Sequence, residues 1–156
     1  MKPVKYVIVA LIAVSGLLVN VKAQSVPERK AAPRILDKTN LVVSAAYNKV
    51  KENKNFTGDL SKAVAHQRFA KKLYMTGQFH RAIHQARIAR EYAIKAIKAN
   101  KGEDFINYKY TPEDEEILKN GPGDAELEAE LMKDSPNEKL TDEDLIKSND
   151  PGIDKK

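Results

Sequence analysis

Three histidines are the side chains best suited to chemistry, and His66, His80 and His84 are the only ones in the chain. His80 and His84 are four residues apart, so in a helix both rings face the same side. Such a pair can bind Zn²⁺, Cu²⁺ or Ni²⁺, but a catalytic zinc site takes three protein ligands. An HExxH motif is ruled out because Arg81 occupies the glutamate position. We therefore predict no metal site and no cofactor, and interpret both residues as polar helix residues.

A set of cationic side chains is the second candidate for binding. One function would be recognition of a polyanion, such as nucleic acid, lipopolysaccharide phosphate or an anionic cell-wall polymer. The alternative is a solvated helix face that the chain's own acidic residues neutralise. No aromatic residues alternate with these cations, so a stacking platform for single-stranded nucleic acid is not indicated. With two aromatic residues from further along the chain, the predicted partner-binding residues are Arg68, Lys71, Lys72, Arg81, Arg87, Arg90, Tyr108 and Tyr110.

Catalytic motifs are missing from the sequence. No cysteine is present, which excludes disulfides, thiol nucleophiles and thiolate metal sites. The acidic clusters lack the spacing of an EF-hand loop. The sequence also has no nucleophile elbow and no phosphate-binding glycine loop. We predict a protein that is not an enzyme.

The elements that must position these side chains centre on residues 59–100, which predict two helices joined at Gly77. Asp59 or Ser61 is expected to cap the first helix, and Gly77 to end it in the left-handed conformation. A connection this short predicts antiparallel packing, which places His66 opposite about residue 88. Apolar residues recur at helical spacing on both sides of the glycine. They are Leu60, Val64, Phe69, Leu73 and Tyr74, then Phe79, Ala82, Ile83, Ala86, Ala89, Ala93, Ala96 and Ile97.

This hairpin resembles a tetratricopeptide (TPR) repeat between about residues 66 and 99. The resemblance rests on Ala70, Leu73, Gly77, Phe79, Ala82, Ala86 and Ala89. In that family the glycine opens the turn and the alanines let the paired helices touch. His66 stands at the usual tryptophan position, and no second copy follows. The resemblance implies one helical hairpin rather than an extended array.

The first 23 residues have the pattern of an export signal. Lys2 and Lys5 precede an uncharged apolar run over Tyr6–Val19, and Val21-Lys22-Ala23 offers small residues to a signal peptidase. The run is shorter than the ~20 residues of a membrane span. We predict cleavage near Ala23 and a periplasmic or secreted mature protein.

A third helix is predicted before the hairpin. Residues 24–36 contain Pro27 and Pro33 and predict a flexible linker. The body then spans residues 37–100, with helices near Lys38–Glu52, Leu60–Thr76 and Gln78–Ala99. The predicted fold is therefore all-α, with a small antiparallel three-helix body. Because alanines are many in its core and each contributes little on burial, we expect either a monomer of modest stability or a core completed by a partner, for example in a homo-oligomer of paired hairpins.

Charge divides the chain near Asn100. Residues 24–100 hold sixteen basic and five acidic residues, whereas residues 101–156 hold eight basic and seventeen acidic ones. The tail contains four prolines and predicts short helices starting at Thr111, Asp124 and Thr141. We expect it to be largely flexible unless it docks on the basic body. The aromatic segment Phe105–Tyr110 is expected to pack on the hairpin or on a partner.

These patterns predict an exported, non-enzymatic interaction module that binds an envelope protein through its hairpin. The alternative is a cationic binder of anionic polymer. Salt separates the two, because polyanion affinity falls steeply with ionic strength and apolar contacts do not.

Overall fold

The computed structural model describes residues 26–102, 109–136, 140–149 and 153. All regular structure in these ranges is helical, which confirms the all-α prediction. The helices are α1 (Val26–Asn53), α2 (Asp59–Met75), α3 (Phe79–Ala99), α4 (Pro112–Lys119), α5 (Asp124–Asp134) and α6 (Asp142–Ser148). The predicted export segment, residues 1–23, lies outside the described residues, as do Phe105–Tyr108.

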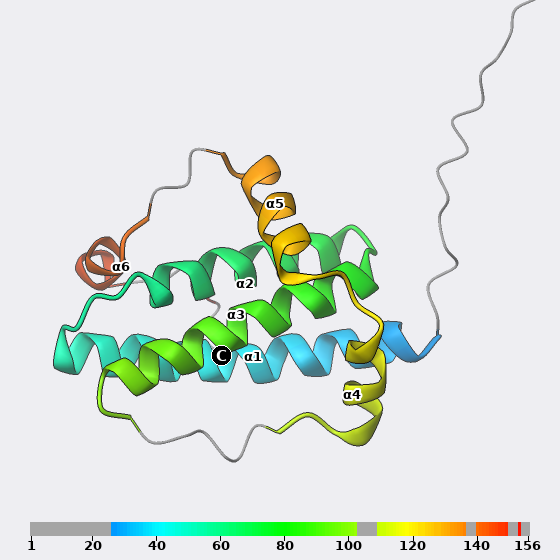
Figure 1. Cartoon of the computed structure of the whole chain (residues 1–156), viewed down its shortest axis with the longest axis horizontal. Helices are drawn as coiled ribbons and strands as arrows, with labels where there is room; N and C mark the ends of the chain where they lie inside the picture. Colours follow the sequence, from blue (N-terminus) through cyan, green and yellow to red (C-terminus); the bar gives the residue numbers. More distant parts are fainter. Residues whose placement is uncertain (1–25, 103–108, 137–139, 150–152, 154–156) are drawn as a thin grey trace, which may run out of the picture.

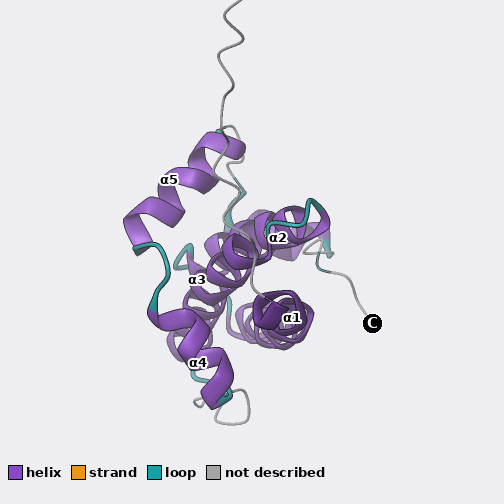
Figure 2. Cartoon of the chain, turned by 90° about the vertical axis from the view of Figure 1, so that its right-hand side faces the viewer, coloured by secondary structure: helices purple, strands orange, loops and turns teal. Residues whose placement is uncertain are grey.

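The long helices α1, α2 and α3 lie side by side and pack against one another (Figure 1). Seen along their axes, the three form a triangle (Figure 2). The core between them consists largely of alanine, valine and isoleucine, with Ala46, Val64 and Ala93 fully buried. Small residues allow the helix axes to approach closely, so the core is compact although few large side chains contribute to it. None of the helices in the described ranges is both long and apolar enough to cross a bilayer.

Gly77 forms the turn between α2 and α3 as the sequence predicts. Its φ of 79° lies in the left-handed region that glycine adopts without a steric penalty. The N–H of Gln78 donates to the carbonyl of Leu73 at 2.8 Å, and the N–H of Gly77 donates to Tyr74 at 3.0 Å. This pair of hydrogen bonds is a Schellman motif, which ends α2 and reverses the chain.

The predicted linker over residues 24–36 is wrong, because α1 begins at Val26 and contains Pro33. Pro27 follows the first helical residue, where its missing N–H costs nothing. Proline inside a helix removes one backbone hydrogen bond. Here the apolar residues around Pro33 compensate, since Ala32 and Ile35 are buried against the hairpin. Tertiary burial therefore extends the helix by more than two turns beyond its predicted start near Lys38.

The predicted N-cap of α2, Asp59 or Ser61, is also wrong. The N-cap is Gly58, with a φ of 84° and no side-chain cap of its own. Asp142 of α6 provides the missing acceptor, because its carboxylate accepts the N–H groups of Gly58 at 2.7 Å and Ser61 at 2.8 Å. Asp59, the residue expected to cap the helix, is instead its first residue.

The described part of the acidic tail forms three short helices that pack on the body. Helix α4 lies beside α1, where Asp114 pairs with Arg34. Thr111 and Asp114 form a capping box, and so do Thr141 and Asp144 at the start of α6. Burial acts to raise the pKa of Asp114, but hydrogen bonds from Arg34 and Thr111 together hold that pKa below its usual value. Helix α5 crosses α2 and α3 on the face away from α1 (Figures 1 and 2).

Candidate functional site

The surface of α2 and α3 beneath α5 is the candidate functional site. We call it the docking surface and define it by His66, Lys72, Arg81, Gln85, Arg87 and Tyr92. Helix α5 lies on it as an amphipathic segment with Leu127 at its centre. Leu127 is fully buried. Burying a leucine side chain contributes about 1.5–3 kcal/mol, so Leu127 is the apolar anchor of the helix.

Three cations of the docking surface pair with three carboxylates of α5. Lys72 contacts Asp134 at 2.5 Å, Arg87 contacts Asp124 at 2.6 Å, and Arg81 pairs with Glu130. The hydrogen bond from Lys72 holds the pKa of Asp134 below its usual value. These pairs are partly exposed, so each contributes little to stability and is weakened by salt. Together they set the orientation and register of α5.

A buried polar network lies between the ion pairs, with Gln85 at its centre. Its amide nitrogen donates to the backbone carbonyl of Leu127 at 3.0 Å and to the carboxylate of Glu130 at 3.3 Å. Its amide oxygen lies 2.7 Å from Nδ1 of His66. Both Gln85 and His66 are fully buried. The hairpin thus contacts the backbone of the docked helix as well as its side chains.

Glu128 completes the network from the α5 side. The hydroxyl of Tyr92 donates to Glu128 Oε1 at 2.6 Å. This hydrogen bond, together with partial burial, raises the pKa of Tyr92 to about 12. His66 stacks on the Tyr92 ring with centroids 5.8 Å apart, and its Nε2 lies 3.4 Å from Glu128 Oε1 without forming a hydrogen bond.

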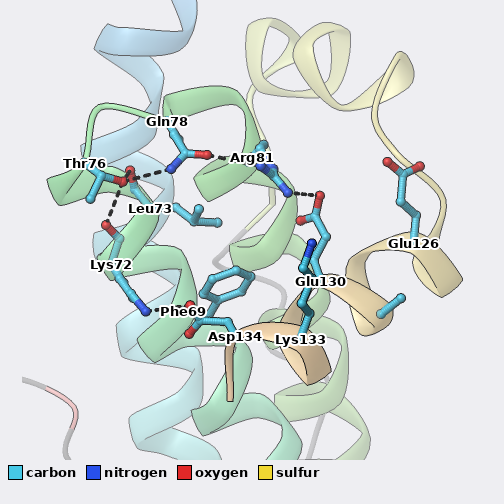
Figure 3. Close-up of a pocket in the computed structure, with 11 residues that line it drawn as sticks. Phe69, Lys72, Leu73, Thr76, Gln78, Arg81, Glu126, Glu130, Lys133 and Asp134 are labelled. Carbon is cyan, nitrogen blue, oxygen red and sulfur yellow. Dashed lines mark hydrogen bonds and ion pairs between the residues drawn. The ribbon is translucent and has the colours of Figure 1, made fainter. Parts of the chain in front are cut away.

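A cavity of about 600 Å³ opens beside α5, at the end of the hairpin nearest Gly77 (Figure 3). Phe69 and Leu73 of α2 supply its apolar lining. The Lys72–Asp134 and Arg81–Glu130 pairs lie along its sides (Figure 3). Its volume lies in the range of small-molecule sites, but most of the residues that line it are polar or charged.

The predicted partner-binding residues separate into groups in the structure. Three of them lie under α5, where each pairs with one of its carboxylates: Lys72, Arg81 and Arg87. Arg90 does not join them, because it is buried with its guanidinium 4.2 Å from the ring centroid of Tyr110. Burial raises the pKa of Tyr110, and Arg90 partly offsets this rise. Arg68 and Lys71 are half-buried on α2, and Tyr108 lies outside the described residues.

The two helical histidines lie together as their spacing predicts, with ring centroids 4.6 Å apart. Nδ1 of His80 is 2.7 Å from a carboxylate oxygen of Glu28. Burial, and to a lesser degree the nearby His80 and Arg87, lower the pKa of His84 from 6.5 to about 4. Among the residues that the structure describes, no three His, Asp or Glu side chains converge as a metal would require. His66 contacts Gln85 and Tyr92, which flank residue 88.

Sequence reasoning did not identify Gln85, Tyr92 and Glu128 as functional residues. A signal for Gln85 was present, since it lies three residues after Ala82 and four before Ala89 and so shares a helix face with apolar residues. A polar residue buried in a helical interface needs partners, so its position predicts a contact with another element. The identity of that element depends on contacts across about forty residues, which local patterns do not encode.

Comparisons with protein-family models, with curated proteins and with solved structures found no significant match.

Proposed function

We propose that this chain is an exported, non-enzymatic interaction module whose docking surface binds an acidic amphipathic helix of an envelope protein. In this proposal α5 occupies the surface as an internal substitute for the partner helix, and the partner must displace it. Export rests on the signal-like pattern of residues 1–23. The resemblance of the hairpin to a TPR repeat supports the same class of function, since it implies paired helices that present a binding face.

The observation that carries this proposal is the seating of α5. A surface that already holds a helix by a buried leucine, a backbone hydrogen bond from Gln85 and three ion pairs has the groups needed to bind another such helix. Recognition of an amphipathic helix in an apolar groove is a recurrent mode of peptide binding. An internal segment that covers the surface keeps its buried anchor site out of water until a partner arrives.

The alternative, binding of an anionic polymer, is less well supported by the same contacts. Lys72, Arg81 and Arg87 are each engaged by a carboxylate of α5. A polymer would gain only partly exposed charge pairs, and it would lack a group to replace the buried Leu127 side chain. Binding that survives high salt would favour a helix partner, whereas binding lost at high salt would favour the polymer.

A direct test uses the full chain with Leu127→Ala, which removes the anchor of α5. Loss of a buried leucine side chain costs about 2–5 kcal/mol, so α5 should leave the surface more than tenfold more readily. A labelled peptide of residues 121–136 should then bind this variant much more tightly than it binds the wild-type chain. Met132→Ala is the matched control, because Met132 is on the same helix but 66% exposed.

The same pair of chains can serve as baits for an envelope extract. A protein partner should be enriched by Leu127→Ala relative to wild type, should remain bound at high salt, and should be released by the peptide. Failure of the peptide to bind either chain would contradict the proposal. Self-association can be followed by the mass of the free chain in solution.

A further inference from the structure

Helix α5 is an imperfect ligand for the docking surface at one atom, Nε2 of His66. The Gln85 amide group is oriented by its donors, since its nitrogen faces the Leu127 carbonyl and the Glu130 carboxylate. Its oxygen must therefore accept the hydrogen bond from His66 Nδ1. That bond fixes the proton of a neutral His66 ring on Nδ1 and leaves a lone pair on Nε2.

A carboxylate oxygen, itself an acceptor, lies beside this lone pair. Glu128 Oε1 lies 3.4 Å from Nε2, and this oxygen already accepts the Tyr92 hydroxyl at 2.6 Å. Within the described ranges, no group donates to Nε2, although His66 is fully buried. A buried acceptor without a donor costs about 1–3 kcal/mol. A cavity of about 130 Å³ between α2 and α5, lined in part by His66 and Glu128, gives the side chain at position 128 room to adjust.

We propose that the preferred partner of the docking surface carries glutamine at the position of Glu128, directly after the leucine anchor. This inference rests on the proposed function and names the chemistry of the partner. An amide nitrogen in place of Glu128 Oε1 has two N–H donors. One would reach His66 Nε2 and the other the Tyr92 oxygen, which can accept as well as donate. Both acceptors would then be satisfied without moving a helix.

The other positions of the partner helix follow from the contacts of α5. Acidic residues should stand three residues before the leucine, and three and seven residues after it, in the places of Asp124, Glu130 and Asp134. These residues contribute orientation and a salt-sensitive attraction. Leucine and the following glutamine contribute specificity, because the leucine itself and the His66 Nε2 atom that the glutamine would reach are buried. A leucine-glutamate segment within the chain itself would then bind well enough to cover the surface and weakly enough to be displaced.

Replacing glutamate by glutamine at position 128 has two opposite effects on binding, so the direction of the change in affinity distinguishes them. Removing a negative charge beside a basic surface, and with it a charge-assisted hydrogen bond from Tyr92, should weaken binding if electrostatics dominates. Satisfying His66 should strengthen it. The test compares peptides of residues 121–136 with glutamate or Glu128→Gln for binding to the full chain carrying Leu127→Ala, near neutral pH. We expect the Glu128→Gln peptide to bind about fivefold more tightly, the size expected when one buried acceptor gains a donor.

The matched control is Glu130→Gln, the same chemical change two residues later, which loses the Arg81 ion pair and should weaken binding. Replacing His66 by leucine in the bait should abolish the advantage of the Glu128→Gln peptide. The inference would be overturned if the Glu128→Gln peptide bound the chain that retains His66 no more tightly than the glutamate peptide does. That result is expected if a bridging water already satisfies Nε2. The proposed function would survive that result as long as the glutamate peptide binds.

A measurement within the intact chain tests the same hydrogen bonds without a separate peptide. Amide hydrogen exchange of α5 should be slower in the Glu128→Gln chain than in wild type, and faster in the Glu130→Gln chain. If α5 exchange in Glu128→Gln is unchanged or faster, the inference fails. If neither peptide binds in trans, the proposed function fails, and this exchange experiment still decides the hydrogen-bond argument.

Discussion

The carboxylate of Asp142, on α6, accepts a hydrogen bond from the backbone N–H of Ser61, in the first turn of α2, at 2.8 Å. The same carboxylate accepts the N–H of Gly58 at 2.7 Å, and Asp142 is 98% buried in this contact. A helix leaves its first N–H groups without partners inside the helix, and a nearby negative charge is favourable there. Residues 81 positions apart thus complete a cap that α2 lacks locally.

Asp142→Ala should therefore destabilise the chain by about 1–2 kcal/mol, the usual cost of losing a helix cap. Chemical denaturation measures this loss, and hydrogen exchange should locate it at the first turn of α2 as well as in α6. Glu143→Ala is the matched control, because Glu143 is exposed in the same turn of α6. Equal destabilisation by both variants would show that the effect comes from α6 alone.

Gly121 lies against His84, and a methyl group there would have no room. A Cβ at position 121 would stand 1.9 Å from the His84 ring, far inside van der Waals contact. Gly121→Ala should destabilise the chain by about 1–3 kcal/mol through this overpacking and shift the segment between α4 and α5. Gly123→Ala is the control two residues later, where a Cβ meets nothing within 4 Å.

The double variant Gly121→Ala with His84→Ala tests whether the clash is the cause. Removing the ring makes room for the methyl group. The double variant should therefore lose less stability than the sum of the losses in the two single variants. Additive losses would place the effect of Gly121→Ala elsewhere, for example in the backbone of the turn.

His84 should make stability depend on pH. Its pKa falls from 6.5 in the unfolded chain to about 4 in the folded one, chiefly because the ring is buried. Between these two values the unfolded chain binds a proton that the folded chain does not, so stability decreases as the pH falls from 6.5 towards about 4. Below about 4 both states are protonated, and this residue adds no further loss.

Denaturation of wild type and of His84→Leu at several pH values measures this contribution. Acidic residues such as Asp114 and Asp134, whose pKa values are lowered, also cause loss of stability in acid, so the difference between the two chains is the relevant quantity. The His84→Leu chain should lose less stability between pH 6.5 and 4 than wild type. Parallel curves would mean that His84 keeps an ordinary pKa in the folded protein.

Lys101 adopts the left-handed conformation that follows the end of α3, with a φ of 58°. The N–H of Gly102 donates to the Ile97 carbonyl at 2.9 Å, so this turn repeats the hydrogen bonding seen at Gly77. A side chain in this conformation costs roughly 1–2 kcal/mol relative to glycine. Lys101→Gly should therefore raise the melting temperature. Lys98→Gly, in the last turn of α3, should lower it, because glycine costs about 1 kcal/mol inside a helix.

Several features of the fold could be predicted from the sequence because they depend on nearby residues. Apolar spacing predicted α2 and α3 within a few residues of their ends, and Gly77 stands at the predicted turn. The Thr111 and Thr141 patterns lie where the two capping boxes form. The divided charge of the chain predicted where cations and carboxylates would be available to pair, but not which of them would meet.

Local patterns failed where a distant contact decided the outcome. Pro33 signalled a break, yet burial of its apolar neighbours on the hairpin holds α1 as a helix. Asp59 and Ser61 suited a cap, yet Asp142 provides the acceptor.

By itself, the sequence determined that the chain forms helices, where the hairpin turns and that the segment after Asn100 is acidic, since each depends on residues near one another along the chain. Only the tertiary structure decided that α5 lies on the hairpin with Leu127 buried, that Gln85 binds its backbone, and that Nε2 of His66 has no donor among the described residues. The reason is physical: helix periodicity acts between neighbours along the chain, whereas these contacts arise from the packing of segments about forty or more residues apart, which depends on the shape of the whole fold.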